Sequence, residues 1–156
     1  MAASSGFTQA MLGDQSQVYQ VNDTEVLIET QDKLVETEDK LELIDVVKGS
    51  VVKELSAGQK ILDVHVLTNP NKIIVLTQTD AGKIQKRVFN DQGAQTGKFQ
   101  YPIRFSKNAE TKLTAPYGHV NERLMVRQGN RFTLYSPAGR QPLVTLDAQI
   151  DKGIYE

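Results

Sequence analysis

The stretch RFTLYSPAGRQPLVTL, residues 131–146, reads as a strand, a turn at Ser136-Pro137-Ala138-Gly139 and a second strand. Its flanks are rich in residues that favour strands, and a Pro-x-Gly step is typical of a tight turn between them. Two earlier stretches have the same plan, LELIDVVKGSVVKEL at residues 41–55 and IQKRVFNDQGAQTGKF at residues 84–99. The chain therefore repeats a strand–turn–strand unit three times.

The three units have a regular spacing, because their turn glycines Gly49, Gly93 and Gly139 lie 44 and 46 residues apart. A further strand precedes each unit and ends in a similar polar step, as EVLIETQDK, KIIVLTQTD and RLMVRQGN. A repeat of roughly 45 residues with about four strands indicates propeller-type blades. Each such unit is a small sheet that buries both of its faces only by stacking against neighbours.

Short segments with strand-like alternation recur along the whole chain, bounded by Gly, Pro, Asn and Asp. We expect strands at residues 26–29, 41–47, 61–67, 73–77, 84–89, 124–127, 132–135 and 143–146. Segment 36–43, ETEDKLEL, has a composition that also suits a helix, but its alternating leucines favour a strand. The expected fold is all-β, with three antiparallel four-stranded blade-like units in a partial or open β-propeller. A β-sandwich is the alternative.

The segment RVFNDQGAQTGKF, residues 87–99, resembles the third strand, turn and fourth strand of repeat β-propellers of the PQQ-like or YVTN-like kind. RFTLYSPAGRQPLVTL and LIDVVKGSVVKEL are similar, and the resemblance covers about residues 15–148 as three units. It implies a type of blade and carries no activity with it. Since the chain has no Trp, the tryptophan-docking motif of PQQ blades and the Trp-Asp pair of WD40 blades are missing. No cofactor is expected.

The expected organisation has a flexible N-terminal segment at residues 1–14, units at 15–56, 57–103 and 104–148, and a tail at 149–156. Three blades do not close a ring, since propellers typically have about four to eight. The chain is then a fragment of a longer propeller, one half of a six-blade homodimer, or an open array with capped ends.

Composition excludes several classes of function. The 18 basic and 19 acidic residues give a net charge of -1 without the basic surplus that nucleic-acid binding usually needs. The absence of cysteine excludes disulfides, thiolate zinc sites and a cysteine nucleophile. The N-terminal MAASSGFTQAMLGDQSQ is not an intact signal peptide, but it resembles a tether from which a leader or membrane anchor was removed. These features favour an extracytoplasmic or cell-surface bacterial protein.

The two histidines have different settings. His65 lies in ILDVHVLT on the same strand face as Asp63, the partner that a catalytic histidine would need. A structural histidine at an interface between blades explains it more simply. His119 lies in the predicted loop TAPYGHVNER near Tyr117 and Glu122. The two histidines do not have the spacing of metal ligands, so no metal site is expected.

Two segments are candidate contact surfaces, the loop at residues 114–123 and the aromatic stretch KFQYPIRF at residues 98–105. The candidate binding residues are Tyr101, Tyr117, His119, Glu122 and Arg123. The acidic residues between 36 and 42 lack the spacing of a calcium loop and are expected to form a solvated face. No nucleophile elbow or phosphate-binding glycine loop is present in the sequence.

These observations favour a non-enzymatic interaction or scaffold module that associates with itself or with a partner protein. Uncovered sheet faces and unpaired edges are association surfaces. One alternative is a propeller-type hydrolase or lyase fragment that uses Asp63, His65 or His119. The other is a ligand-binding domain of a cell-surface or envelope protein.

Overall fold

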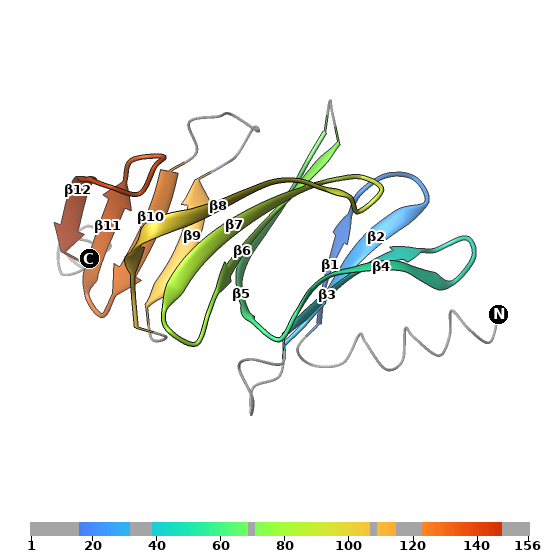
Figure 1. The fold of residues 1–156 in the computed structure, drawn as a ribbon, viewed down its shortest axis with the longest axis horizontal. Coiled ribbons are helices and arrows are strands. Elements are labelled where there is room, and N and C mark those ends of the chain that lie inside the picture. The colour runs from blue at the N-terminus through green and yellow to red at the C-terminus, as the bar shows by residue number, and fades with distance from the viewer. Residues whose placement is uncertain (1–15, 32–38, 69–70, 107–108, 115–122, 148–156) are drawn as a thin grey trace, which may run out of the picture.

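The computed structural model describes residues 16–31, 39–68, 71–106, 109–114 and 123–147, and these residues form three antiparallel sheets of four strands each (Figure 1). Within every sheet each strand pairs with its neighbour in the sequence, and no sheet closes on itself. The prediction of an all-β chain with three four-stranded units is confirmed. The described part of the chain has no helix with the length and hydrophobicity of a membrane span.

The sheets follow one another along the chain. Sheet A contains β1 (Ser16–Gln20), β2 (Glu25–Thr30), β3 (Lys40–Asp45) and β4 (Ser50–Ala57). Sheet B contains β5 (Lys60–Leu67), β6 (Lys72–Gln78), β7 (Lys83–Asn90) and β8 (Gln95–Arg104). Sheet C contains β9 (Glu110–Thr114), β10 (Arg123–Gln128), β11 (Arg131–Tyr135) and β12 (Pro142–Asp147). All eight predicted strand segments fall on these strands, except that β3 ends at Asp45 and residues 46–47 belong to the following turn.

Sheet B lies between two hydrophobic cores, so its strands need apolar residues on both faces. The core between sheets A and B contains Leu27, Leu41, Leu43 and Leu55 from sheet A and Ile61, Val64, Ile73, Val75 and Phe89 from sheet B. The core between sheets B and C contains Ile74, Leu76, Ile84 and Tyr101 from sheet B and Leu113, Leu124 and Val126 from sheet C.

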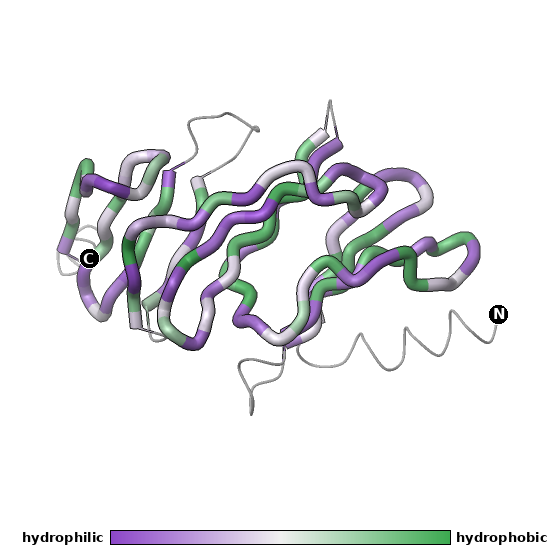
Figure 2. The backbone as a smooth tube through the Cα atoms, viewed as in Figure 1, coloured by the Kyte–Doolittle hydropathy of each residue, from purple (hydrophilic) through white to green (hydrophobic). Residues whose placement is uncertain are grey.

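The sequence of β6, KIIVLTQ, is almost continuously apolar because both faces of this strand lie in hydrophobic cores. Successive side chains of a strand point to opposite faces. Ile73 and Val75 therefore belong to the core with sheet A, whereas Ile74 and Leu76 belong to the core with sheet C. Hydrophobic residues also continue to both ends of the array, into the β3–β4 turn and into β12 (Figure 2).

The three aligned glycines share one backbone conformation. Gly49, Gly93 and Gly139 have φ values of 67°, 84° and 69°, in the left-handed region that glycine adopts without a steric penalty. Each lies in the turn between the third and fourth strands of its sheet. Its N–H donates to the carbonyl of Asp45, Asn90 or Ser136 at 2.8, 3.1 and 2.7 Å, respectively.

Candidate functional sites

Three of the predicted binding residues, Tyr117, His119 and Glu122, lie outside the described residues. Arg123 begins β10, and its backbone N–H donates to Thr114 Oγ1 at 2.9 Å. Tyr101 in β8 is only 2% exposed and packs edge-to-face on Phe99, with ring centroids 4.9 Å apart. The binding role of these residues stays a prediction, but the Tyr101 ring is a core element instead of an exposed contact surface.

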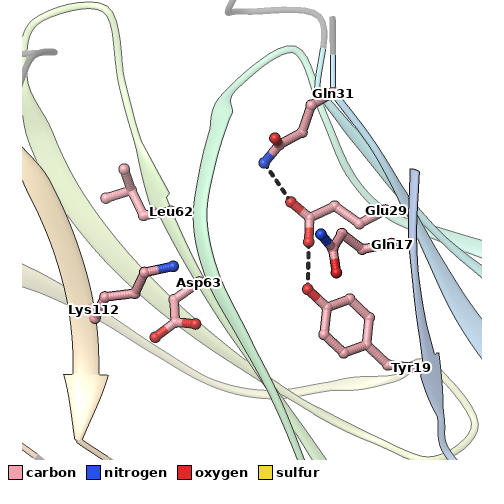
Figure 3. A pocket seen from close by; sticks show the side chains of 7 residues that line it. All are labelled: Gln17, Tyr19, Glu29, Gln31, Leu62, Asp63 and Lys112. Carbon is pink, nitrogen blue, oxygen red and sulfur yellow. Dashed lines mark hydrogen bonds between the residues drawn. The ribbon is translucent and has the colours of Figure 1, made fainter. Parts of the chain in front are cut away.

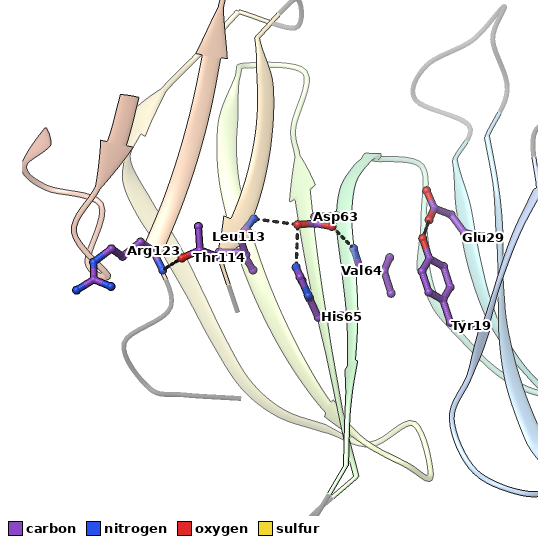
Figure 4. A network of polar contacts seen from close by, with 8 residues as sticks. All are labelled: Tyr19, Glu29, Asp63, Val64, His65, Leu113, Thr114 and Arg123. Carbon is purple, nitrogen blue, oxygen red and sulfur yellow. Dashed lines mark hydrogen bonds and ion pairs between the residues drawn. The ribbon is translucent and has the colours of Figure 1, made fainter. Parts of the chain in front are cut away.

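Asp63 and His65 are brought together on β5, as their alternation in the sequence predicts. His65 Nε2 lies 2.9 Å from Asp63 Oδ2. The same carboxylate oxygen accepts the backbone N–H of Leu113 in β9 at 2.9 Å, and Asp63 Oδ1 accepts the N–H of Val64 at 3.0 Å (Figure 4). Asp63 therefore joins sheet B to sheet C. Both of its oxygens are engaged in backbone contacts, which fits a structural residue at an interface between sheets.

A polar pocket of about 250 Å³ opens where the three sheets meet. Sheet A contributes side chains from β1 and β2 and the residue that follows β2, sheet B contributes β5, and sheet C contributes β9. The lining consists of Gln17, Tyr19, Glu29, Gln31, Leu62, Asp63 and Lys112 (Figure 3). Strands β1, β5 and β9 are the first strands of their sheets, so the pocket lies on the side of the array where the first strands meet.

Glu29 is the most buried charged residue of this pocket, at 4% exposed. Tyr19 donates its hydroxyl to Glu29 Oε1 at 2.7 Å, and Gln31 Nε2 donates to Glu29 Oε2 at 2.6 Å. Burial raises the pKa of the Glu29 carboxyl, and the two hydrogen bonds oppose this shift only in part. Burial also raises the pKa of the Tyr19 phenol, and its hydrogen bond to Glu29 raises it further.

The opposite wall of the pocket carries a cation. Lys112 of β9 faces the cavity beside Asp63 (Figure 3), and its charge acts to lower the pKa of Glu29. Within the described ranges the side chains of Lys112 and Gln17 form no ion pair or hydrogen bond. No group of three or more His, Cys, Asp or Glu suited to a metal ion occurs among the described residues.

The sequence does contain an indication that Glu29 is a site residue, although the prediction of strands by alternation did not single it out. In EVLIET, Glu29 shares a face with Leu27, which is fully buried in the core between sheets A and B. An acidic residue on the buried face of a strand needs polar partners. Those partners are Tyr19 of β1, ten residues upstream, and Gln31, which follows β2.

A second candidate site follows from how consecutive sheets contact each other. A Cβ placed on Gly93, in the β7–β8 turn, would lie 3.3 Å from Leu55 Cδ2 in β4 of the preceding sheet. A Cβ on Gly139, in the β11–β12 turn, would lie 2.5 Å from Tyr101 Cδ1 in β8. The turn glycine of sheets B and C therefore packs on the fourth strand of the sheet before it.

Strand register places Leu146 of β12 in the position equivalent to Leu55 and Tyr101. Leu43, Lys86 and Leu134 are each the fourth residue of the third strand of their sheet, and they pair directly with Lys53, Phe99 and Val144, respectively. Leu55, Tyr101 and Leu146 each follow two residues later on the fourth strand. Leu55 and Tyr101 are buried, whereas Leu146 is 51% exposed.

Among the described residues, no further sheet packs on β12 at one end of the array or against the β3–β4 turn at the other end. At one end, β12 exposes Val144 and Leu146 on the face turned away from sheet B, the face that they share with Leu134 and Phe132. At the other end, the β3–β4 turn exposes Val47 at 65%. In sheets B and C the corresponding turn is packed on a preceding sheet.

Comparison with solved structures finds the same fold in the uncharacterized protein lmo1340 from Listeria monocytogenes EGD-e, with a TM-score of 0.52 and 11% sequence identity. The match covers 83% of this chain and 40% of the Listeria protein, so this chain spans less than half of that protein's length. The likeness defines an all-β array of consecutive four-stranded sheets. No protein-family model matches the chain, and the search of curated proteins returns no match.

Proposed function

We propose that this chain is a non-enzymatic interaction module built from three propeller-type blades, and that its copies associate head to tail. The β3–β4 turn of one copy packs on β12 of another. This contact repeats the one that sheets B and C make with their preceding sheets inside the chain. Two copies joined in this way at both ends give a six-sheet assembly with two identical interfaces.

The proposal of head-to-tail association rests on the exposure of the Leu146 side chain. Its equivalents Leu55 and Tyr101 are each covered by a glycine turn of the next sheet, and no described residue follows sheet C to cover β12. Exposed aliphatic side chains in a contiguous row favour association, because covering them removes apolar surface from water.

The other end supplies a matching element. The β3–β4 turn also has a glycine with positive φ whose N–H donates to a carbonyl at or just after the end of the third strand, although that carbonyl lies four residues back in sheet A and three residues back in sheets B and C. It also presents Val46 and Val47, whereas the turns of sheets B and C have Asp91 and Gln92 or Pro137 and Ala138 in the comparable stretch. The turn at the open end is therefore the most apolar of the three.

Size-exclusion chromatography with light scattering over a wide concentration range tests this function. The wild-type chain of 17.4 kDa is expected to form a dimer of about 35 kDa, twice that mass. Leu146→Glu and Val47→Glu are each expected to give monomers, because a buried unpaired carboxylate opposes association.

Lys98→Glu, at an exposed position of β8, serves as the matched control and is expected to leave the dimer intact. A wild-type chain that stays monomeric at every concentration contradicts self-association. A Val47→Glu variant that still forms a dimer, beside a monomeric Leu146→Glu variant, indicates instead that two β12 faces pair with each other.

A further inference from the structure

The pocket between the three sheets holds opposite charges that do not pair with each other. Glu29 of β2 is bonded only to the neutral side chains of Tyr19 and Gln31. The side chain of Lys112 of β9, on the facing wall, forms no ion pair or hydrogen bond with another described residue. Charged groups around a cavity are usually compensated by a partner. Here the space between the carboxylate and the ammonium group is the cavity itself.

A molecule that carries both charges completes this arrangement. Its carboxylate would accept hydrogen bonds from Lys112 Nζ, and its ammonium group would donate to the Glu29 carboxylate. Charge-assisted hydrogen bonds of this kind are among the strongest polar contacts in proteins. A neutral polyol would leave Glu29 and Lys112 without a counter-charge.

Size and lining restrict the occupant further. The cavity of about 250 Å³ is smaller than the roughly 300–1,000 Å³ of pockets for drug-sized ligands. Leu62 is the one apolar side chain in the lining, beside Gln17, Gln31 and Asp63. The side-chain amide of Gln17, which has no hydrogen bond to a described residue, and the side-chain oxygen of Gln31 are available to further polar groups. An apolar ligand is therefore disfavoured.

We propose that this inter-sheet pocket binds a small zwitterion of the α-amino-acid class, with its carboxylate on Lys112 and its ammonium group on Glu29. The lining comes from all three sheets, so the bound molecule bridges sheet A to sheet C beside the contact of Asp63 with Leu113. Binding stabilises the folded array, since the ligand has no such site in the unfolded chain. The proposal is independent of head-to-tail association.

Calorimetric titration and two-dimensional amide NMR of the full chain test the proposal, with glycine, L-serine and L-glutamine as probes. The expected result is saturable binding of at least one of them, with shifts of the Gln17, Leu62 and Lys112 amides. Three control compounds are expected to bind at least roughly tenfold more weakly. They are D-glucose, which is a neutral polyol, acetate, which carries only the negative charge, and methylammonium, which carries only the positive charge.

The variants Lys112→Met and Glu29→Gln are each expected to weaken amino-acid binding by at least roughly tenfold, as the loss of a charged hydrogen-bond partner predicts. Lys98→Met on the exposed face of β8 is the matched control and is expected to bind like the wild type. Lys112 is exposed, so its variant is expected to fold normally even if Glu29→Gln does not. Absence of binding for all three amino acids, equal binding of D-glucose, or unchanged affinity in Lys112→Met would overturn the proposal.

Discussion

Gly139 lies so close to the ring of Tyr101 that a Cβ on this glycine would be 2.5 Å from Tyr101 Cδ1. The two residues are 38 positions apart and belong to different sheets, so this contact links the repeat in the sequence to the stacking in space. Gly93 and Leu55 have the same relationship one sheet earlier. The repeat of roughly 45 residues in the sequence therefore corresponds to an interface that recurs between consecutive sheets.

Gly139→Ala is expected to lower the free energy of unfolding by about 2 to 4 kcal/mol, because it adds a positive-φ penalty to a clash with a buried ring. Gly129→Ala is the matched control. Gly129 has φ 59° and nothing within 4 Å of its added Cβ, so only the backbone penalty of about 1 to 2 kcal/mol applies. Urea denaturation measures both. Equal losses for the two variants would show that the Tyr101 contact contributes nothing.

Asp63→Ala is expected to destabilise the protein by about 1 to 3 kcal/mol, because it removes the acceptor of the Leu113 N–H between sheets B and C. Asp63→Asn keeps an acceptor oxygen and is expected to lose less. Hydrogen exchange gives the specific readout, since the Leu113 amide should lose protection in the alanine variant before amides in the core of sheet A do. Unchanged protection at Leu113 would contradict the linking role of Asp63.

Glu29 is expected to make stability depend on pH. Burial raises the pKa of its carboxyl above the ordinary value of 4.5, so the folded state holds this proton at pH values where the unfolded chain has released it. Stability from this group is therefore greatest at acidic pH and declines as pH rises through the raised pKa. This dependence applies to the chain without a bound ligand.

Glu29→Gln removes the titrating group while keeping an acceptor for Tyr19. We compare the free energy of unfolding of the variant with that of the wild type at each pH. This difference is expected to favour the variant more at neutral pH than at pH values below the ordinary carboxyl range. Urea unfolding across that interval measures the difference. A gap between variant and wild type that stays constant with pH, or that changes in the opposite direction, is inconsistent with a raised pKa.

The sequence predicted the strands well where alternation was strong. Strands β1 and β9, with the sequences SQVYQ and ETKLT, were not predicted, because both are short and mostly polar. Their pairing with β2 and β10 adds the fourth strand to sheets A and C. Tertiary pairing, which local composition does not reveal, decides such segments.

Of the candidate sites, one was predictable from the sequence and one was not. Alternation on one strand predicted that Asp63 and His65 lie together, and they are in contact at 2.9 Å. The pocket was not predictable, because Tyr19, Glu29 and Lys112 come from three strands in two sheets. Which strands meet at the junction depends on how the sheets stack, and a single sequence does not specify that geometry.

The most direct test of head-to-tail association mixes two variants that are each damaged at one end. Val47→Glu keeps an intact β12 face, and Leu146→Glu keeps an intact β3–β4 turn. Light scattering is expected to find each variant monomeric alone and an equimolar mixture dimeric, because one intact interface forms between the two. A mixture that stays monomeric while the wild type forms a dimer would contradict the proposed contact.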